Sequence, residues 1–147
     1  MDKAVVRKLM YEADEEKAMT FVKSCKDPET LHLYAYNYNW GDGFEKPTAI
    51  INNPVCSLST ALQLFYDADG LEFLSDMEQE VDDWQQPWLD LVKALYQRII
   101  DRDFSTASIK FVPPLTKVEL YQIKKDLSDK ELVLITPIEG TDCNIQL

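Results

Sequence analysis

The hydrophobic residues of this chain recur mostly at steps of three and four, the spacing of helices with one apolar face. Two long stripes of this kind predict helices over residues 3–24 and 86–100, the second with Pro87 near its first turn. The first stripe consists of Val5, Val6, Leu9, Met10, Ala13, Ala18, Phe21 and Val22, and the second of Trp88, Leu91, Val92, Leu95, Tyr96, Ile99 and Ile100. Both helices need neighbours to cover their apolar faces.

Capping residues and prolines predict shorter helices between and after these stripes. The predicted spans are 28–39, 47–52, 58–66 with a turn over 67–70, 71–74 and 117–127. Their start signals are Asp27 with Pro28, Pro47, Ser57 or Ser59, and a capping box formed by Thr116 and Glu119.

Beyond Phe104 the pattern changes to short apolar runs. Residues 109–112 are β-branched and aromatic, and residues 132–135 form a second apolar run, so we expect two short paired strands. The fold class predicted is mainly α, a helical domain of short packed helices with a small C-terminal β element; an α+β fold is the alternative. With 147 residues and no long linker, the chain is expected to form a single domain over residues 1–147.

The composition excludes several protein classes. Hydrophobic residues make up 46% of the chain, which argues against disorder. Three widely spaced cysteines, Cys25, Cys56 and Cys143, and a single histidine favour neither a disulfide framework nor a zinc site. We therefore expect no metal and no cofactor.

The N-terminus lacks the apolar core of a signal peptide, and no segment approaches the roughly 18–20 apolar residues that span a bilayer. A cytoplasmic protein without membrane contact is expected. The acidic pI of 4.4 argues against binding nucleic acid or anionic lipid through bulk charge. Partners should be basic or neutral.

Recognisable catalytic motifs are absent from the sequence. His32 falls in the first turns of a predicted helix, and we expect it to be a surface or partly buried structural residue. Cys25 and Cys56 have no neighbouring signature for a lowered thiol pKa, so both are interpreted as small core residues. These observations favour a protein that is not an enzyme.

Asp67, Asp69 and Gly70 resemble the middle of a calcium-binding EF-hand loop. If Gly70 takes the glycine position of that loop, the first ligand position falls on Phe65 and the last on Asp76. Phenylalanine cannot coordinate calcium, and the usual bidentate glutamate is missing. A helix end followed by a tight turn explains these residues better.

Negative charge is concentrated in one third of the chain. Of the formal net charge of −11, residues 1–46 contribute −2 and residues 93–147 contribute zero. The stretch between Pro47 and Val92 has no Lys, Arg or His, and its nine carboxylates are Asp67, Asp69, Glu72, Asp76, Glu78, Glu80, Asp82, Asp83 and Asp90. Charge concentrated beside aromatic residues favours a surface for a basic partner, with a solvated acidic face as the alternative. The predicted partner-binding residues are Asp76, Glu78, Glu80, Asp82, Asp83, Trp84 and Trp88, although core packing is an alternative role for either tryptophan.

Three segments carry a resemblance to a known family: AYNYNWGDGFEKP at residues 35–47, NNPVC at 52–56 and TALQLFYDADG at 60–70. Residues 31–75 resemble a small bacterial family of unknown function. The resemblance implies bacterial origin and a small helical module, and proteins of this type look similar to cargo of toxin and immunity loci. It implies no catalytic residues, and residues 76–147 lie outside it.

The leading hypothesis is an immunity protein that neutralises a cognate, basic nuclease toxin domain. The carboxylates would mimic phosphates or pair with active-site Lys and Arg, and a tryptophan would anchor the interface. One alternative is a general interaction module that uses its helical grooves or the Trp40–Phe44 turn. The other is an undetected metal-dependent hydrolase with acidic catalytic residues.

Overall fold

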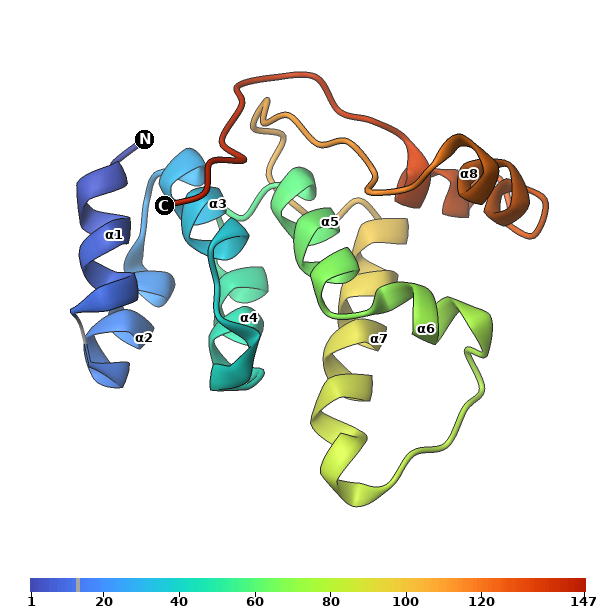
Figure 1. The fold of residues 1–147 in the computed structure, drawn as a ribbon, viewed down its shortest axis with the longest axis horizontal. Coiled ribbons are helices and arrows are strands. Elements are labelled where there is room, and N and C mark those ends of the chain that lie inside the picture. The colour runs from blue at the N-terminus through green and yellow to red at the C-terminus, as the bar shows by residue number, and fades with distance from the viewer. Residues whose placement is uncertain (13) are drawn as a thin grey trace.

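Short α-helices make up most of the computed structural model, which describes residues 1–12 and 14–147 (Figure 1). The α-helices are α1 (Lys3–Tyr11), α2 (Glu15–Ser24), α3 (Pro28–Tyr36), α4 (Glu45–Asn52), α5 (Leu58–Asp67), α6 (Gly70–Ser75), α7 (Gln86–Ile100) and α8 (Lys117–Lys124). Three 3-10 helices accompany them: η1 (Trp40–Asp42), η2 (Asp83–Gln85) and η3 (Lys130–Ile135). The fold is mainly α, as the sequence predicts, and no described helix is long and apolar enough to cross a membrane.

The helices stack as pairs in two layers (Figure 1). Helix α1 packs on α2, α3 on α4, and α5 on α7, and the three pairs lie side by side. One layer therefore contains α1, α3 and α5, and the other contains α2, α4 and α7. Stacked helix pairs create extended surfaces that solenoid proteins use for binding, even though this sequence has no evident repeat.

The prediction of one helix over residues 3–24 is wrong, because α1 ends at Tyr11 and a second helix, α2, begins at Glu15. The Asp14 carboxylate accepts a hydrogen bond from Lys17 N (2.8 Å) and caps a new helix, α2. An N-cap aspartate satisfies a free backbone donor and so favours a helix start at this position. Ala13, a member of the predicted stripe, lies outside the described residues. The break produces two helices that pack against each other.

Two further boundaries differ from the prediction. Helix α3 ends at Tyr36 rather than near Asn39, because the Asn37 side chain donates to Leu33 O (2.9 Å) and to Ile145 O (2.8 Å). The amide therefore occupies the helix end and ties it to the C-terminal segment. Helix α4 begins at Glu45, so Pro47 lies within its first turn and is not its first residue.

The predicted C-terminal strand pair is also wrong. Residues 132–135 belong to η3, which begins at Lys130. Ser128 and Glu131 bond each other across its start: Ser128 N donates to Glu131 Oε1 (3.0 Å), and Glu131 N donates to Ser128 Oγ (3.4 Å). Phe111 instead pairs with Ile138 through two backbone hydrogen bonds (2.8 and 2.9 Å). The extended residues of the described chain make only isolated bridges, so no sheet forms there.

Most predicted caps are confirmed. Asp27 caps α3, and Ser57 rather than Ser59 caps α5, with its hydroxyl accepting from Thr60 N (3.1 Å). Thr116 and Glu119 form the predicted capping box (3.1 and 2.9 Å) ahead of α8, which ends at Lys124, before the predicted residue 127. Helices α5, α6 and α7 lie where the apolar stripes place them.

His32 is fully buried, which corrects the expectation of a surface or partly buried residue. Its Nδ1 atom lies 2.9 Å from Thr60 Oγ1 in α5, and its Nε2 atom lies 3.0 Å from Asn144 Oδ1 in the C-terminal segment. The imidazole therefore joins α3, α5 and the C-terminal segment inside the core.

Lys46 is a buried cation that the sequence does not mark. Only 4% of its side chain is exposed, and its ammonium pairs with the Glu15 carboxylate. A buried ammonium is costly unless it is paired and hydrogen-bonded. This contact therefore fixes α2 against α4.

We expect Glu15→Gln to lower the free energy of unfolding by about 1 kcal/mol, because Lys46 would keep only an uncharged partner. Glu15 is itself 76% exposed, so solvent screens part of the loss. Urea unfolding measures the effect, with Glu16→Gln as the control at the neighbouring exposed position. Equal stabilities of the two variants would contradict the assignment.

Candidate functional site

The acidic loop, residues 76–83, connects α6 to α7 and carries five of the predicted binding residues. In Figure 1 the chain arcs away from the helices between the end of α6 and the start of α7. The exposed carboxylates are Asp76, Glu78, Glu80, Asp82 and Asp83. Within the described ranges, none of them forms an ion pair with a Lys or Arg side chain. The acidic loop therefore presents uncompensated negative charge to solvent.

Local contacts give the acidic loop a defined shape. Asp76 Oδ1 accepts from Glu78 N (3.1 Å), which closes a tight turn. The Gln79 side chain donates to Asp76 O (2.8 Å) and to Glu72 O (3.2 Å), which fastens the loop to α6. Val81 packs half-buried against the core. A loop held in this way loses less conformational entropy when a partner binds.

The two predicted tryptophans have different environments. Trp84 lies in η2, directly after the acidic loop, and 77% of it is exposed. Trp88 is half-buried, and its indole Nε1–H donates to Ala68 O at the end of α5 (2.6 Å). Trp84 is thus accessible to a partner, whereas Trp88 also fixes α7 against α5.

Asp67 is the last residue of α5, and Asp69 lies in the turn directly before α6, so neither belongs to the acidic loop. Gln63 Nε2 donates to both carboxylate oxygens of Asp67 (3.1 Å each), and Asp69 has a positive φ of 59° directly before α6. Residues 1–12 and 14–147 contain no group of three or more His, Cys, Asp or Glu side chains placed to hold a metal ion. Asp67 therefore bonds within α5, and Asp69 provides the left-handed backbone of the turn into α6.

Comparison with known proteins places this helical unit in a family. Residues 26–100 match a family described as Domain of unknown function (DUF4274), and the match covers just over half of the chain. The chain belongs to the DUF4274 family. No curated protein and no solved structure matches it.

The DUF4274 match contains the candidate site. It runs from just before α3 to the end of α7 and so includes the acidic loop, Trp84 and Trp88. The resemblance seen in the sequence is narrower, because it covers residues 31–75 and leaves the acidic run outside. The family description assigns no activity and says nothing of toxin or immunity loci.

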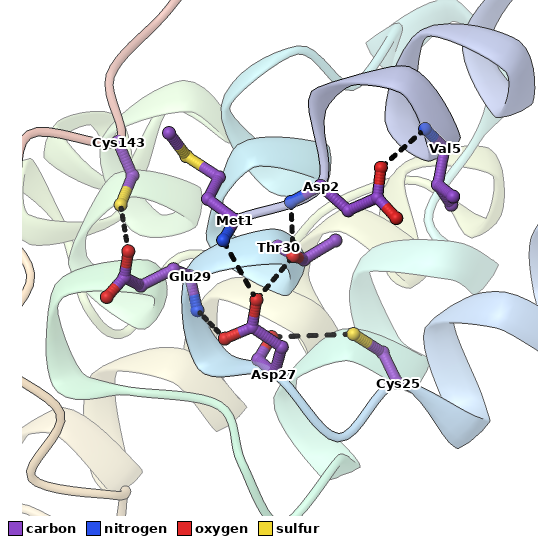
Figure 2. Close-up of polar contacts among 8 residues, drawn as sticks. All are labelled: Met1, Asp2, Val5, Cys25, Asp27, Glu29, Thr30 and Cys143. Carbon is purple, nitrogen blue, oxygen red and sulfur yellow. Dashed lines mark hydrogen bonds and ion pairs between the residues drawn. The ribbon is translucent and has the colours of Figure 1, made fainter.

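Figure 2 shows the polar contacts around the start of α3, where two of the three cysteines of this DUF4274 protein lie. The Cys25 thiol donates to Asp27 O (3.4 Å), and the Cys143 thiol donates to Glu29 Oε1 (3.9 Å). Burial raises the pKa of Cys143 to about 11 and that of Cys56 to about 12. Thiols with a raised pKa carry little thiolate at neutral pH and are poor nucleophiles. Cys56 is a buried core residue, as predicted, and Cys25 is half-buried.

The same contacts in Figure 2 join α1 to the first turn of α3. Asp2 N donates to Thr30 Oγ1 (2.9 Å), and the Thr30 hydroxyl donates to Asp27 Oδ2 (2.5 Å). The Thr30 hydroxyl is the main reason that the pKa of Asp27 lies below its usual range. This ionised N-cap stabilises the start of α3.

A groove across the layer of α2, α4 and α7 is missed by sequence reasoning. Its apolar lining includes Met19, Ala49 and Leu91, which come from three separate segments. Met19 and Ala49 are apolar but lie outside the apolar stripes that predict the core, which is a weak sign that they face something else. No sequence spacing indicates that Met19, Ala49 and Leu91 lie close together in the fold.

Proposed function

We propose that this DUF4274 protein is an immunity protein that binds a basic nuclease toxin domain and covers its active site or nucleic-acid groove. The observation that carries the proposal is Trp84, which is 77% exposed at the end of a loop whose five carboxylates form no ion pair with any described residue. A large exposed apolar side chain beside concentrated charge favours a protein interface. The proposed role requires binding alone and no catalytic residue.

The acidic loop supplies the electrostatic part of this proposal. Carboxylates held close together repel one another, and cations of a partner relieve that repulsion. Nucleases bind phosphates through Lys and Arg, and the carboxylates would pair with those same groups. Negative charge also accelerates association with a basic partner at low ionic strength.

Trp84 supplies the anchor. Tryptophan is among the residues that contribute most to binding when an interface buries them. Met77, at the α6 end of the same loop, is 36% exposed and offers a second apolar side chain. Trp88 remains a predicted contact, with its indole N–H already bonded to Ala68 O.

We expect Trp84→Ala to weaken binding to the cognate basic nuclease toxin domain about 30-fold, because a central anchor is lost. Isothermal titration calorimetry measures the affinity, and growth on co-expression measures protection. Because Trp84 is exposed, the free protein should unfold at nearly the wild-type temperature. Failure of the wild-type protein to bind or protect would reject the immunity proposal.

A matched pair of charge variants tests the acidic loop itself. The loop variant carries Asp76→Asn, Glu78→Gln, Glu80→Gln, Asp82→Asn and Asp83→Asn. The control neutralises five exposed carboxylates elsewhere: Glu12, Glu16, Asp126, Asp129 and Glu139. Both variants change the net charge equally. If the position of the charge matters, the loop variant should associate more slowly than the control variant. Equal association rates at low salt would contradict a local role for the acidic loop.

A further inference from the structure

An open groove of about 810 Å³ crosses the layer formed by α2, α4 and α7. Its floor is mainly apolar, with Met19 from α2, Ala49 from α4, and Leu91 and Ala94 from α7. In stacked helix pairs, the surface shared by one layer is a common place for a partner to bind. The half-buried side chains of Met19, Ala49 and Ala94 offer apolar area that a partner would remove from water.

Charged side chains border this apolar floor. Asp42, Glu45 and Asp90 are exposed on the α4 and α7 sides, and Lys23 is exposed on α2. Across the part of the chain that the structure describes, none of these four forms an ion pair. The border therefore has a net charge of −2 and complements a basic occupant.

The two uncharged polar side chains along the groove, Thr48 and Asn52, already have partners inside the protein. Thr48 Oγ1 donates to Phe44 O (2.7 Å), and Asn52 Oδ1 accepts from Arg98 (3.2 Å). An extended peptide would find few groups for its backbone donors and acceptors. A helix satisfies its own backbone and needs only an apolar face, so it fits this lining better.

The groove reaches the N-terminal end of α7, which is close in sequence to the candidate site. Pro87, which lines the groove, follows Trp84 by three residues, whereas the acidic loop arcs from α6 to the start of α7 (Figure 1). Packed helices lie about 8–10 Å apart, so the path from α2 across α4 to α7 is about 20 Å long. A helix of about 13 residues covers that length at about 1.5 Å per residue.

We infer that this groove receives a basic amphipathic helix of the partner protein, with apolar residues at steps of three and four and Lys or Arg on its flanks. The inference rests on the proposed function and assigns to the partner a structural element that the acidic loop alone does not specify. Met19, Ala49 and Ala94 contact the apolar face of that helix. Glu45 and Asp90 pair with its cations.

The probe is a fluorescein-labelled, N-acetylated peptide of 14 residues, with leucine at helical steps of three and four and lysine elsewhere. Fluorescence anisotropy should show binding to the wild-type protein and at least tenfold weaker binding to Ala94→Trp, which fills the groove. Gln97→Trp is the control, because Gln97 is exposed on the same helix and does not line the groove. Circular dichroism verifies that both variants fold.

A charge exchange avoids any effect on packing. Glu45→Lys combined with Asp90→Lys changes two exposed residues, and it should weaken the leucine–lysine peptide at least tenfold. The same double variant should prefer a leucine–glutamate peptide of identical pattern. Lys23→Glu should tighten the leucine–lysine peptide. No preference in either exchange would overturn the inference.

The remaining outcomes separate this inference from the proposed function. If the toxin domain binds Ala94→Trp and the charge-exchanged variant as tightly as wild type, the groove inference fails while the immunity proposal stands. If the groove variants change peptide affinity as expected but the toxin domain does not bind the wild-type protein, the immunity proposal fails. Equal binding of a proline-interrupted peptide would reject a helical occupant. Self-association that Ala94→Trp abolishes would assign the groove to a second copy of this chain and overturn the inference.

Discussion

Replacing His32 with leucine is expected to lower the free energy of unfolding by about 3 kcal/mol, because the buried Thr60 hydroxyl and the half-buried Asn144 amide each lose a partner. The imidazole lies 2.9 Å from Thr60 Oγ1 and 3.0 Å from Asn144 Oδ1, and none of it is exposed. Asn144 Oδ1 can only accept, so the Nε2–H must donate to it. Leucine fills most of the volume but leaves both polar atoms facing an apolar side chain.

His32 should also make stability depend on pH in a defined window. Burial is the main cause that lowers the pKa of His32 below 6.5, while the Asn144 hydrogen bond and the Asp142 charge oppose the shift. The unfolded chain therefore takes up a proton near pH 6.5, before the folded protein does. His32 contributes fully above that pH, and stability falls below it by up to about 1.4 kcal/mol per pH unit until the folded pKa is reached.

Urea unfolding at a series of pH values tests both parts of this prediction. The chain has one histidine, so the difference between the wild-type and His32→Leu slopes between pH 5 and 6.5 reports on His32 alone. His32→Gln should recover part of the loss, because its amide can still donate to Asn144. If the free energy of unfolding changes with pH equally in the wild type and in His32→Leu, or if the substitution lowers it by less than about 1 kcal/mol, the hydrogen bonds of His32 contribute little.

Signals that act within a few residues predict much of this fold. The caps at Asp27, Ser57 and Thr116 place three helix starts correctly, because each side chain bonds a backbone N–H of the turn it begins. The same rule applies to Asp14, which caps α2. There the continuous apolar pattern suggests one long helix instead, and at residues 132–135 a similar apolar run suggests a strand where η3 forms.

Other features depend on segments that meet only in the folded protein. Burial of His32 requires Asn144, and burial of Lys46 requires Glu15, and neither pair has a characteristic sequence spacing. The groove likewise combines α2, α4 and α7. The acidic loop is the opposite case, because its charge and its neighbouring Trp84 are contiguous in the sequence. Its sequence predicts a surface site, and the structure adds that Trp84 is exposed whereas Trp88 is bonded to α5.

Gly70 is a position where two effects of one methyl group oppose each other. Replacing glycine with alanine in a helix normally stabilises a protein by about 0.4–1 kcal/mol, because the unfolded chain has less conformational freedom. At Gly70, however, a Cβ atom would lie 2.5 Å from Cδ2 of Phe65 and closer still to its Cε2. Phe65 is fully buried, and its ring packs edge-on against Tyr66, so it has little space to move.

Gly70→Ala is therefore expected to destabilise the protein by about 2–3 kcal/mol, the scale of overpacking a filled core. A double-mutant cycle with Phe65→Leu, measured by urea unfolding, identifies the cause. The smaller side chain removes the ring atoms that clash, so Gly70→Ala should cost less than about 0.5 kcal/mol in that background. An equal cost in both backgrounds would exclude the clash and point to the backbone at the start of α6. A rescue by Phe65→Leu would show that close packing of α5 requires glycine at the start of α6, six residues before the acidic loop begins.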